Sequence, residues 1–172
     1  MANALGTTNS GRFVQSSFGK PGNFELAVLE GVTPDGTLVH WWRDNTASSP
    51  MPWNRGSVIS SFGSGSIIQS TFGIDPGNFE VLVLQTTHVM HYYRDNSDVS
   101  NPWTVGGIVS SAATSTPPFI QGTFVGRSGA PGNFEAVILE GSNLVHYWRD
   151  NSVDGYPWFK SGPITKQSTG PG

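Results

Sequence analysis

Three short stretches of the chain carry a dense set of side chains that could bind or react with a ligand. They read LVHWWRDNT from Leu38, VMHYYRDNS from Val89 and LVHYWRDNS from Leu144. Each combines an imidazole, two aromatic rings, a guanidinium and a carboxylate. His, Asp and Arg can take part in acid–base catalysis, whereas aromatic rings beside Arg and Asp are suited to binding a sugar. The question is why one chain carries the set three times.

The sequence around these stretches repeats as well. PGNFE begins at Pro21, Pro76 and Pro131, a spacing of 55 residues each time. Every copy has the same order: a segment ending Q-x-x-F, PGNFE with a hydrophobic run, a turn, the H-aromatic-aromatic-R-D-N stretch, a polar loop and Pro-Trp. We therefore expect one domain, 1–172, built from repeats at about 11–63, 64–113 and 114–166.

Each repeat offers four segments of strand length separated by turn residues, which predicts an all-β fold. The composition agrees, because charged residues are only 12% while aromatic residues reach 12% and glycines number 22. The segments FELAVLE, FEVLVLQ and FEAVILE are apolar on both faces, as strands buried on both sides are. Blades of a β-propeller stack face to face and bury their inner strands in this way, so three blades are favoured over a β-prism or a β-trefoil.

Three blades are fewer than the roughly four to eight that close a propeller. On their own they would leave two apolar sheet faces open to water. Two chains related by a two-fold axis could close one ring without further sequence. We therefore predict a homodimer that forms a six-bladed β-propeller.

Side chains alternate between the two faces of a strand. In each stretch the His, the second aromatic residue and the Asp share one face, and the first aromatic residue and the Arg share the other. The Trp after each polar loop is expected to be better exposed than the strand aromatics. The candidate ligand-binding residues are Trp53, Trp103, Trp158, Arg43, Arg94, Arg149, Asp44, Asp95, Asp150, His40, His91 and His146.

The same residues also fit a purely structural role. Buried His, Asp and Arg can satisfy one another inside a blade, with each Arg stacked on an aromatic ring and paired with Glu30 or Glu140. Repetition alone does not separate the two interpretations, because a symmetric scaffold and a multivalent binder both repeat every residue.

Several classes of function are not expected. An enzyme usually places one acid–base set in one pocket, whereas almost every carboxylate here recurs in each repeat, so we expect no catalytic residues. One His per stretch and no Cys give no metal site, and we expect no cofactor. The net charge of −3 and the scattered Lys and Arg argue against nucleic acid. The opening MANALGTTNSG has neither a basic flank nor an apolar run, so we expect no signal peptide and no membrane insertion, which leaves the compartment open.

The repeats resemble the blades of bacterial and fungal β-propeller lectins, the tectonin-like and Photorhabdus-type groups. The matching segments are GNFELAV, LVHWW and PW in the first repeat, GNFEVLV, VMHYY and PW in the second, and GNFEAVI, LVHYW and PW in the third. The resemblance implies a multivalent lectin that binds glycans, fucose or related sugars, in pockets between adjacent blades. The alternative is a structural or protein-interaction propeller, designed or fragment-like ones included, without a small-molecule site.

Overall fold

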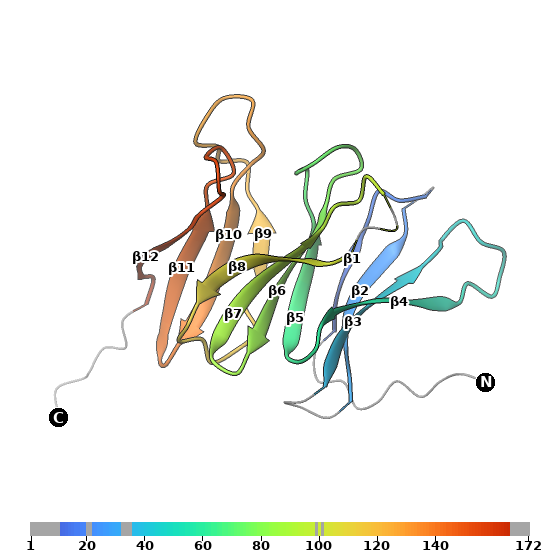
Figure 1. The fold of residues 1–172 in the computed structure, drawn as a ribbon, viewed down its shortest axis with the longest axis horizontal. Helices are drawn as coiled ribbons and strands as arrows, with labels where there is room; N and C mark the ends of the chain where they lie inside the picture. Colours follow the sequence, from blue (N-terminus) through green and yellow to red (C-terminus); the bar gives the residue numbers. More distant parts are fainter. Residues whose placement is uncertain (1–10, 20–21, 32–35, 99, 101, 166–172) are drawn as a thin grey trace.

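The computed structural model describes residues 11–19, 22–31, 36–98, 100 and 102–165. These residues form twelve β-strands and no helix, which confirms the all-β prediction. The strands build three antiparallel sheets of four strands each, and in every sheet the strands lie side by side in chain order (Figure 1).

Each sheet lies within one of the three sequence repeats. The first contains β1 (Gly11–Gln15), β2 (Phe24–Glu30), β3 (Thr37–Arg43) and β4 (Trp53–Ser60). The second contains β5 (Ser64–Gln69), β6 (Phe79–Gln85), β7 (His88–Arg94) and β8 (Thr104–Ser110). The third contains β9 (Phe119–Gln121), β10 (Phe134–Glu140), β11 (Asn143–Arg149) and β12 (Trp158–Pro163).

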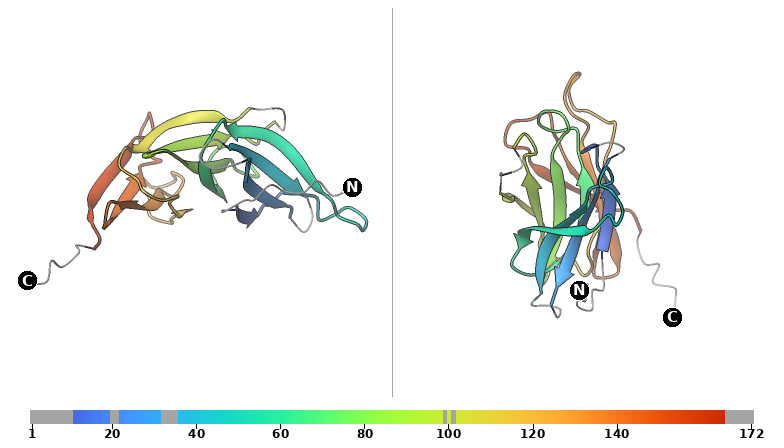
Figure 2. Two further views of the ribbon diagram at one scale, coloured as in Figure 1. Left: turned by 90° about the horizontal axis from the view of Figure 1, so that it is seen from below. Right: turned by 90° about the vertical axis from the view of Figure 1, so that its right-hand side faces the viewer.

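The three sheets stand face to face along an open arc, seen most clearly in the left view of Figure 2. Strands β1, β5 and β9 lie on the inside of the arc, and β4, β8 and β12 lie on the outside. Strand β5 contacts both β1 and β9. The first and the third sheet therefore each have one face toward the middle sheet and one face at an open end of the arc.

The hydrophobic core is divided between the two spaces that separate the sheets. One cluster joins the first and second sheets and includes Val81 and Val83; the other joins the second and third and includes Leu82. All three side chains have no exposed area. Strand β6 is thus buried on both faces, as its continuous apolar sequence predicts.

The turn before the second strand of each sheet ends in the Gly-Asn pair of PGNFE. Its glycine is required there because the backbone of the preceding segment passes very close. A Cβ atom at Gly77 would lie 1.8 Å from the carbonyl oxygen of Ser70, and Gly77 has a φ of 88°. Only glycine fits this position without moving the backbone. The turn sets the position of the Asn and Glu that follow, which both line a pocket.

Candidate binding sites between the sheets

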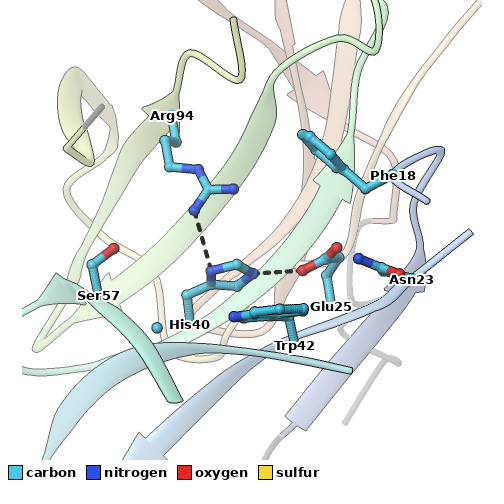
Figure 3. A pocket seen from close by; sticks show the side chains of 8 residues that line it. Phe18, Asn23, Glu25, His40, Trp42, Ser57 and Arg94 are labelled. Carbon is cyan, nitrogen blue, oxygen red and sulfur yellow. Dashed lines mark hydrogen bonds and ion pairs between the residues drawn. The ribbon is translucent and has the colours of Figure 1, made fainter. Parts of the chain in front are cut away.

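The first pocket lies between the first and second sheets and has a volume of about 380 Å³ (Figure 3). Two aromatic rings, Phe18 and Trp42, form part of its wall. All of its polar side chains come from the first sheet except the guanidinium of Arg94, which the next sheet contributes. The polar side chains are Asn23, Glu25, His40, Ser57 and Arg94.

A hydrogen-bonded chain of side chains crosses this pocket. The Ser16 hydroxyl donates to Glu25 Oε1 at 2.8 Å, and Glu25 Oε2 lies 2.8 Å from His40 Nε2. On the other side of the imidazole, Arg94 Nη1 lies 3.4 Å from His40 Nδ1. Figure 3 shows Glu25 and Arg94 approaching the ring from opposite sides. Glu25 and His40 are buried, so the chain links the two sheets inside the protein.

The second pocket, between the second and third sheets, has a volume of about 240 Å³ and repeats this arrangement. Ser70 Oγ donates to Glu80 Oε1 at 3.0 Å, Glu80 Oε2 lies 2.7 Å from His91 Nε2, and Arg149 Nη1 lies 3.4 Å from His91 Nδ1. The aromatic rings in its wall are Phe72, Tyr93 and Tyr156. Sequence-distant residues from two sheets therefore meet in the same geometry twice.

Burial keeps the histidine of the second pocket neutral. Removal from water lowers the pKa of His91, an effect larger than the opposing attraction of Glu80. A neutral ring that faces a carboxylate at Nε2 carries its proton there and donates it to Glu80. Nδ1 is then free to accept a hydrogen bond from Arg149, whose pKa burial also lowers. The carboxylate and the guanidinium balance each other across an uncharged imidazole.

The lowered pKa of His91 predicts how stability depends on pH. In the unfolded chain His91 takes up a proton as the pH falls through 6.5, its ordinary value, while the folded protein resists protonation. The contribution of the neutral His91 to the free energy of unfolding is therefore fully present above that pH, and it decreases as the pH falls below it. We expect the free energy of unfolding, measured in urea, to be lower at about pH 5.5 than at about pH 7.5. The His88→Gln variant, which removes an exposed imidazole, should keep this dependence; a free energy of unfolding that is the same at both pH values would contradict it.

Each Arg of the R-D-N stretch is held by aromatic rings, as predicted. The guanidinium carbon of Arg43 lies 4.7 Å from the Phe24 ring centre, and that of Arg149 lies 4.1 Å from the Phe134 ring centre. The prediction that the arginines pair with Glu30 or Glu140 is wrong. Arg43 Nε donates instead to Asn45 two residues later, at 2.9 Å, and the other two arginines do the same.

The carboxylates expected to pair with these arginines have other partners. Glu30 binds Arg55 and the indole of Trp41. Glu140 binds Lys160 and accepts a hydrogen bond from the Tyr147 hydroxyl. Both glutamates lie at the end of the sheet opposite to the R-D-N stretch, so the length of a strand separates each glutamate from the arginine.

The aspartates of the three stretches fold back onto their own loops. Asp44 Oδ1 accepts hydrogen bonds from the backbone and the side chain of Thr46, and Asp150 does the same with Ser152. Asp95 Oδ1 accepts from the backbone of Ser97. These side chains close a turn two residues long, and none of them lines a pocket described above.

The tryptophans that follow the polar loops do not line the pockets. Trp53 is 40% exposed, but Trp103 and Trp158 are half-buried and stand edge-on against His40 and His91. They are covered because the neighbouring sheet packs onto them. The pocket walls use the second aromatic residue of each stretch, Trp42, Tyr93 and Trp148, together with Phe18, Phe72 and Phe124. The sequence did contain a signal for these pocket residues, because strand alternation places the second aromatic residue on the same face as the His.

The third copy of the pocket is only partly built. Phe124, Asn133, Glu135, His146 and Trp148 line a space of about 300 Å³ on the open face of the third sheet. Glu135 Oε2 lies 2.6 Å from His146 Nε2, as in the other copies. The His146 side chain is nevertheless 35% exposed, and its Nδ1 lies 3.2 Å from Ser161 Oγ. Among the described residues, no following sheet supplies an Arg to this pocket.

Two buried amide atoms in these pockets lack a protein partner. Among the described residues, Asn78 Oδ1 in the second pocket and Asn133 Nδ2 in the third make no hydrogen bond, although Asn78 is 6% and Asn133 0% exposed. Buried polar groups are nearly always paired, because an unpaired one costs about 1–3 kcal/mol. Each of these two asparagines therefore retains one hydrogen-bonding atom that no described protein group uses.

In the first two pockets the geometry does not favour nucleophilic catalysis. A serine nucleophile needs its hydroxyl in contact with a general base. Ser16 and Ser70 instead donate to the glutamates, while the histidines bind those glutamates through Nε2. In the part of the chain that the structure describes, no three His, Asp or Glu side chains gather as metal ligands, and no helix is long and apolar enough to cross a membrane.

Comparison of the chain with protein-family models, with curated proteins and with solved structures found no match in any of the three. The function is therefore inferred from the pockets themselves.

Proposed function

We propose that this protein is a multivalent carbohydrate-binding protein whose pockets lie between neighbouring sheets. The observation that carries the proposal is the pairing, in each of the three pockets, of a half-buried aromatic ring with an asparagine, which in the second and third pockets is buried and has one unpaired amide atom. A sugar presents an apolar face of C–H groups and a rim of hydroxyls. Trp42, Tyr93 and Trp148 offer the plane, and Asn23, Asn78 and Asn133 stand at the equivalent polar position.

The Glu–His–Arg chain supports the same proposal. A guanidinium held in place by an imidazole and an aromatic ring in the pocket wall provides donors that need no reorganisation when a hydroxyl arrives. The charges of the chain are balanced internally, so the pocket suits a neutral polyol better than an anion. The volumes, about 380 and 240 Å³ for the two complete pockets, fit a ligand of monosaccharide size.

The sites should be individually weak. A shallow sugar site exchanges hydrogen bonds to water for bonds to protein, with a net gain of roughly 1 kcal/mol each. We expect a dissociation constant in the millimolar to high-micromolar range, which corresponds to about −4 to −6 kcal/mol. Several such sites that meet a glycan-coated surface together can gain about 10²–10⁴ in avidity. This gain explains why a binder would carry the set of residues in every sheet.

The test is titration with a monosaccharide panel that includes L-fucose, followed by binding to a glycan-coated surface. Tyr93→Ala should remove one binding site per chain and leave the affinity of the remaining sites unchanged, while surface avidity falls steeply. Phe62→Ala, which removes an exposed ring from the turn between the first two sheets, is the matched control and should change neither. Loss of all binding from Tyr93→Ala alone, or no sugar bound by the wild type, would refute near-equivalent sugar sites.

The second candidate is a structural or protein-interaction scaffold. It is favoured by one observation, namely that Arg94 and Arg149 reach across to His40 and His91 and so join neighbouring sheets without any ligand. The same panel separates the two functions, because a scaffold without a small-molecule site binds none of the sugars and keeps its stability when they are added.

A further inference from the structure

The open face of the third sheet exposes residues whose counterparts are buried between the sheets. Ile164 is 57% exposed, whereas Ile59 and Val109, at the same place in the first two repeats, are 4% and 6% exposed. Leu144 is 38% exposed, and its counterparts Leu38 and Val89 have no exposed area. Ile164 is held beside Leu144 by a backbone hydrogen bond, N to O, of 2.7 Å. These side chains are apolar like those of a sheet face that is buried inside the arc, but no sheet among the described residues covers them.

The open face of the first sheet has the complementary property. Phe13 is paired with Leu26 in its sheet, as Ile67 is paired with Val81 and Phe119 with Ala136. Phe13 is 66% exposed, whereas Ile67 and Phe119 are 4% and 6% exposed. This face is therefore the kind that packs against a preceding sheet, and no sheet precedes it among the described residues.

The unused arginine lies on that same face. Arg94 and Arg149 each complete the pocket of the sheet before their own. Arg43 is prepared in the same way, with its guanidinium over Phe24 and Trp53 and its Nε bonded to Asn45. The third pocket has its Glu, His, Asn and aromatic rings but lacks an Arg from a following sheet. The chain thus carries one pocket without an arginine and one arginine without a pocket.

We propose that the first sheet of one copy packs on the third sheet of a second copy, so that Arg43 completes the third pocket across the junction. The contact repeats the geometry that the chain already uses twice internally. Because it joins two different faces, it is a head-to-tail contact, which forms a ring when the rotation closes and a filament when it does not. The curvature of the arc, with β1, β5 and β9 on its inner side, favours closure (Figure 2). Two copies then form one ring of six sheets.

The third pocket differs in ways that suit an arginine from outside the chain. Gly122 stands where Ser16 and Ser70 bind the glutamate in the other copies, so Glu135 lacks that donor. Ser161 stands where the other sheets have Gly56 and Gly106, and its hydroxyl oxygen beside His146 Nδ1 adds an acceptor for a guanidinium. What the completed pocket binds rests on the proposed function; the association of the copies does not.

Native mass spectrometry or light scattering at micromolar concentration tests the association without any ligand. The wild type should have twice the chain mass of 18.4 kDa. Phe13→Asp and Ile164→Asp each place a charge in the junction and should have the mass of one chain, with circular dichroism unchanged. Ile108→Asp alters an equally exposed isoleucine on the outer strand β8 of the middle sheet and should remain a dimer. A monomeric wild type, a filament, or face variants that remain dimeric would overturn the proposal.

Arginine modification tests the position of Arg43. In the wild type, phenylglyoxal should spare Arg43 as it spares Arg94 and Arg149, while the exposed Arg127 reacts. In the monomeric Ile164→Asp variant Arg43 should react, and equal reactivity of Arg43 in both proteins would place it outside the junction.

L-Fucose titration separates the two proposals. A dimer that binds none loses the proposed function and keeps the association, whereas a monomer with two sites per chain keeps the function and loses the association.

Discussion

Replacing Glu80 with alanine is expected to lower the free energy of unfolding by about 3–5 kcal/mol, the usual cost of removing one partner from a buried charged pair. Glu80 is 1% exposed, and its two oxygens bind Ser70 and His91. Its charge also compensates Arg149, which is only 5% exposed. Without Glu80, a guanidinium, an imidazole and a hydroxyl all lose a partner at a site where the side chains are almost completely buried.

Urea unfolding at one fixed protein concentration measures this effect. The control is Glu30→Ala, because Glu30 is also a glutamate of a second strand, but it pairs with Arg55 at the surface. Exposed ion pairs contribute little, so this variant should lose far less stability. Equal losses in the two variants would show that the buried chain of residues does not hold the sheets together.

Replacing Gly106 with alanine is expected to destabilise the protein by about 1–3 kcal/mol, the range for overpacking a filled interior. A Cβ atom at this position would lie 2.2 Å from His91 Nδ1, and the buried ring, held by Glu80, has no room to retreat. The third sheet carries Ser161 at this position, where His146 lies on the open face of the sheet.

Thermal unfolding of Gly106→Ala against Gly162→Ala tests this explanation. An added Cβ at Gly162 meets nothing within 4 Å, so the control should be neutral or slightly stabilising. If Gly106→Ala unfolded at the temperature of the wild type, His91 would have space that the structure does not show.

The fold was largely predictable because it depends on local patterns that repeat. The 55-residue spacing of PGNFE, four segments of strand length per repeat and the two-sided apolar strands predicted three four-stranded sheets. The alternation of side chains also placed His40 and Trp42 correctly on one face, where both line the first pocket. These features follow from backbone geometry within a strand, which a sequence shows directly.

The site was predicted only in part, because its members come from different sheets. Sequence alone could not show that Arg94 lies beside His40, since 54 residues separate them and only the stacking of the sheets brings them together. It also predicted that Trp103 is better exposed than the strand aromatics, although the neighbouring sheet half-buries that ring. Asn78 was missed because an amide after a glycine resembles an ordinary turn residue until the structure shows that it lines a pocket and has an unpaired buried oxygen.

The repeat, the all-β class and the strand face on which each His, Trp and Arg side chain lies all follow from the sequence. Which of these side chains meet depends on how the sheets stack. Exposure and hydrogen-bond partners depend on what packs against a face, and that neighbour comes from another repeat. The same His–aromatic–Arg pattern therefore gives two buried pockets inside the arc and one open half-pocket at its end, where packing has placed no neighbour among the described residues.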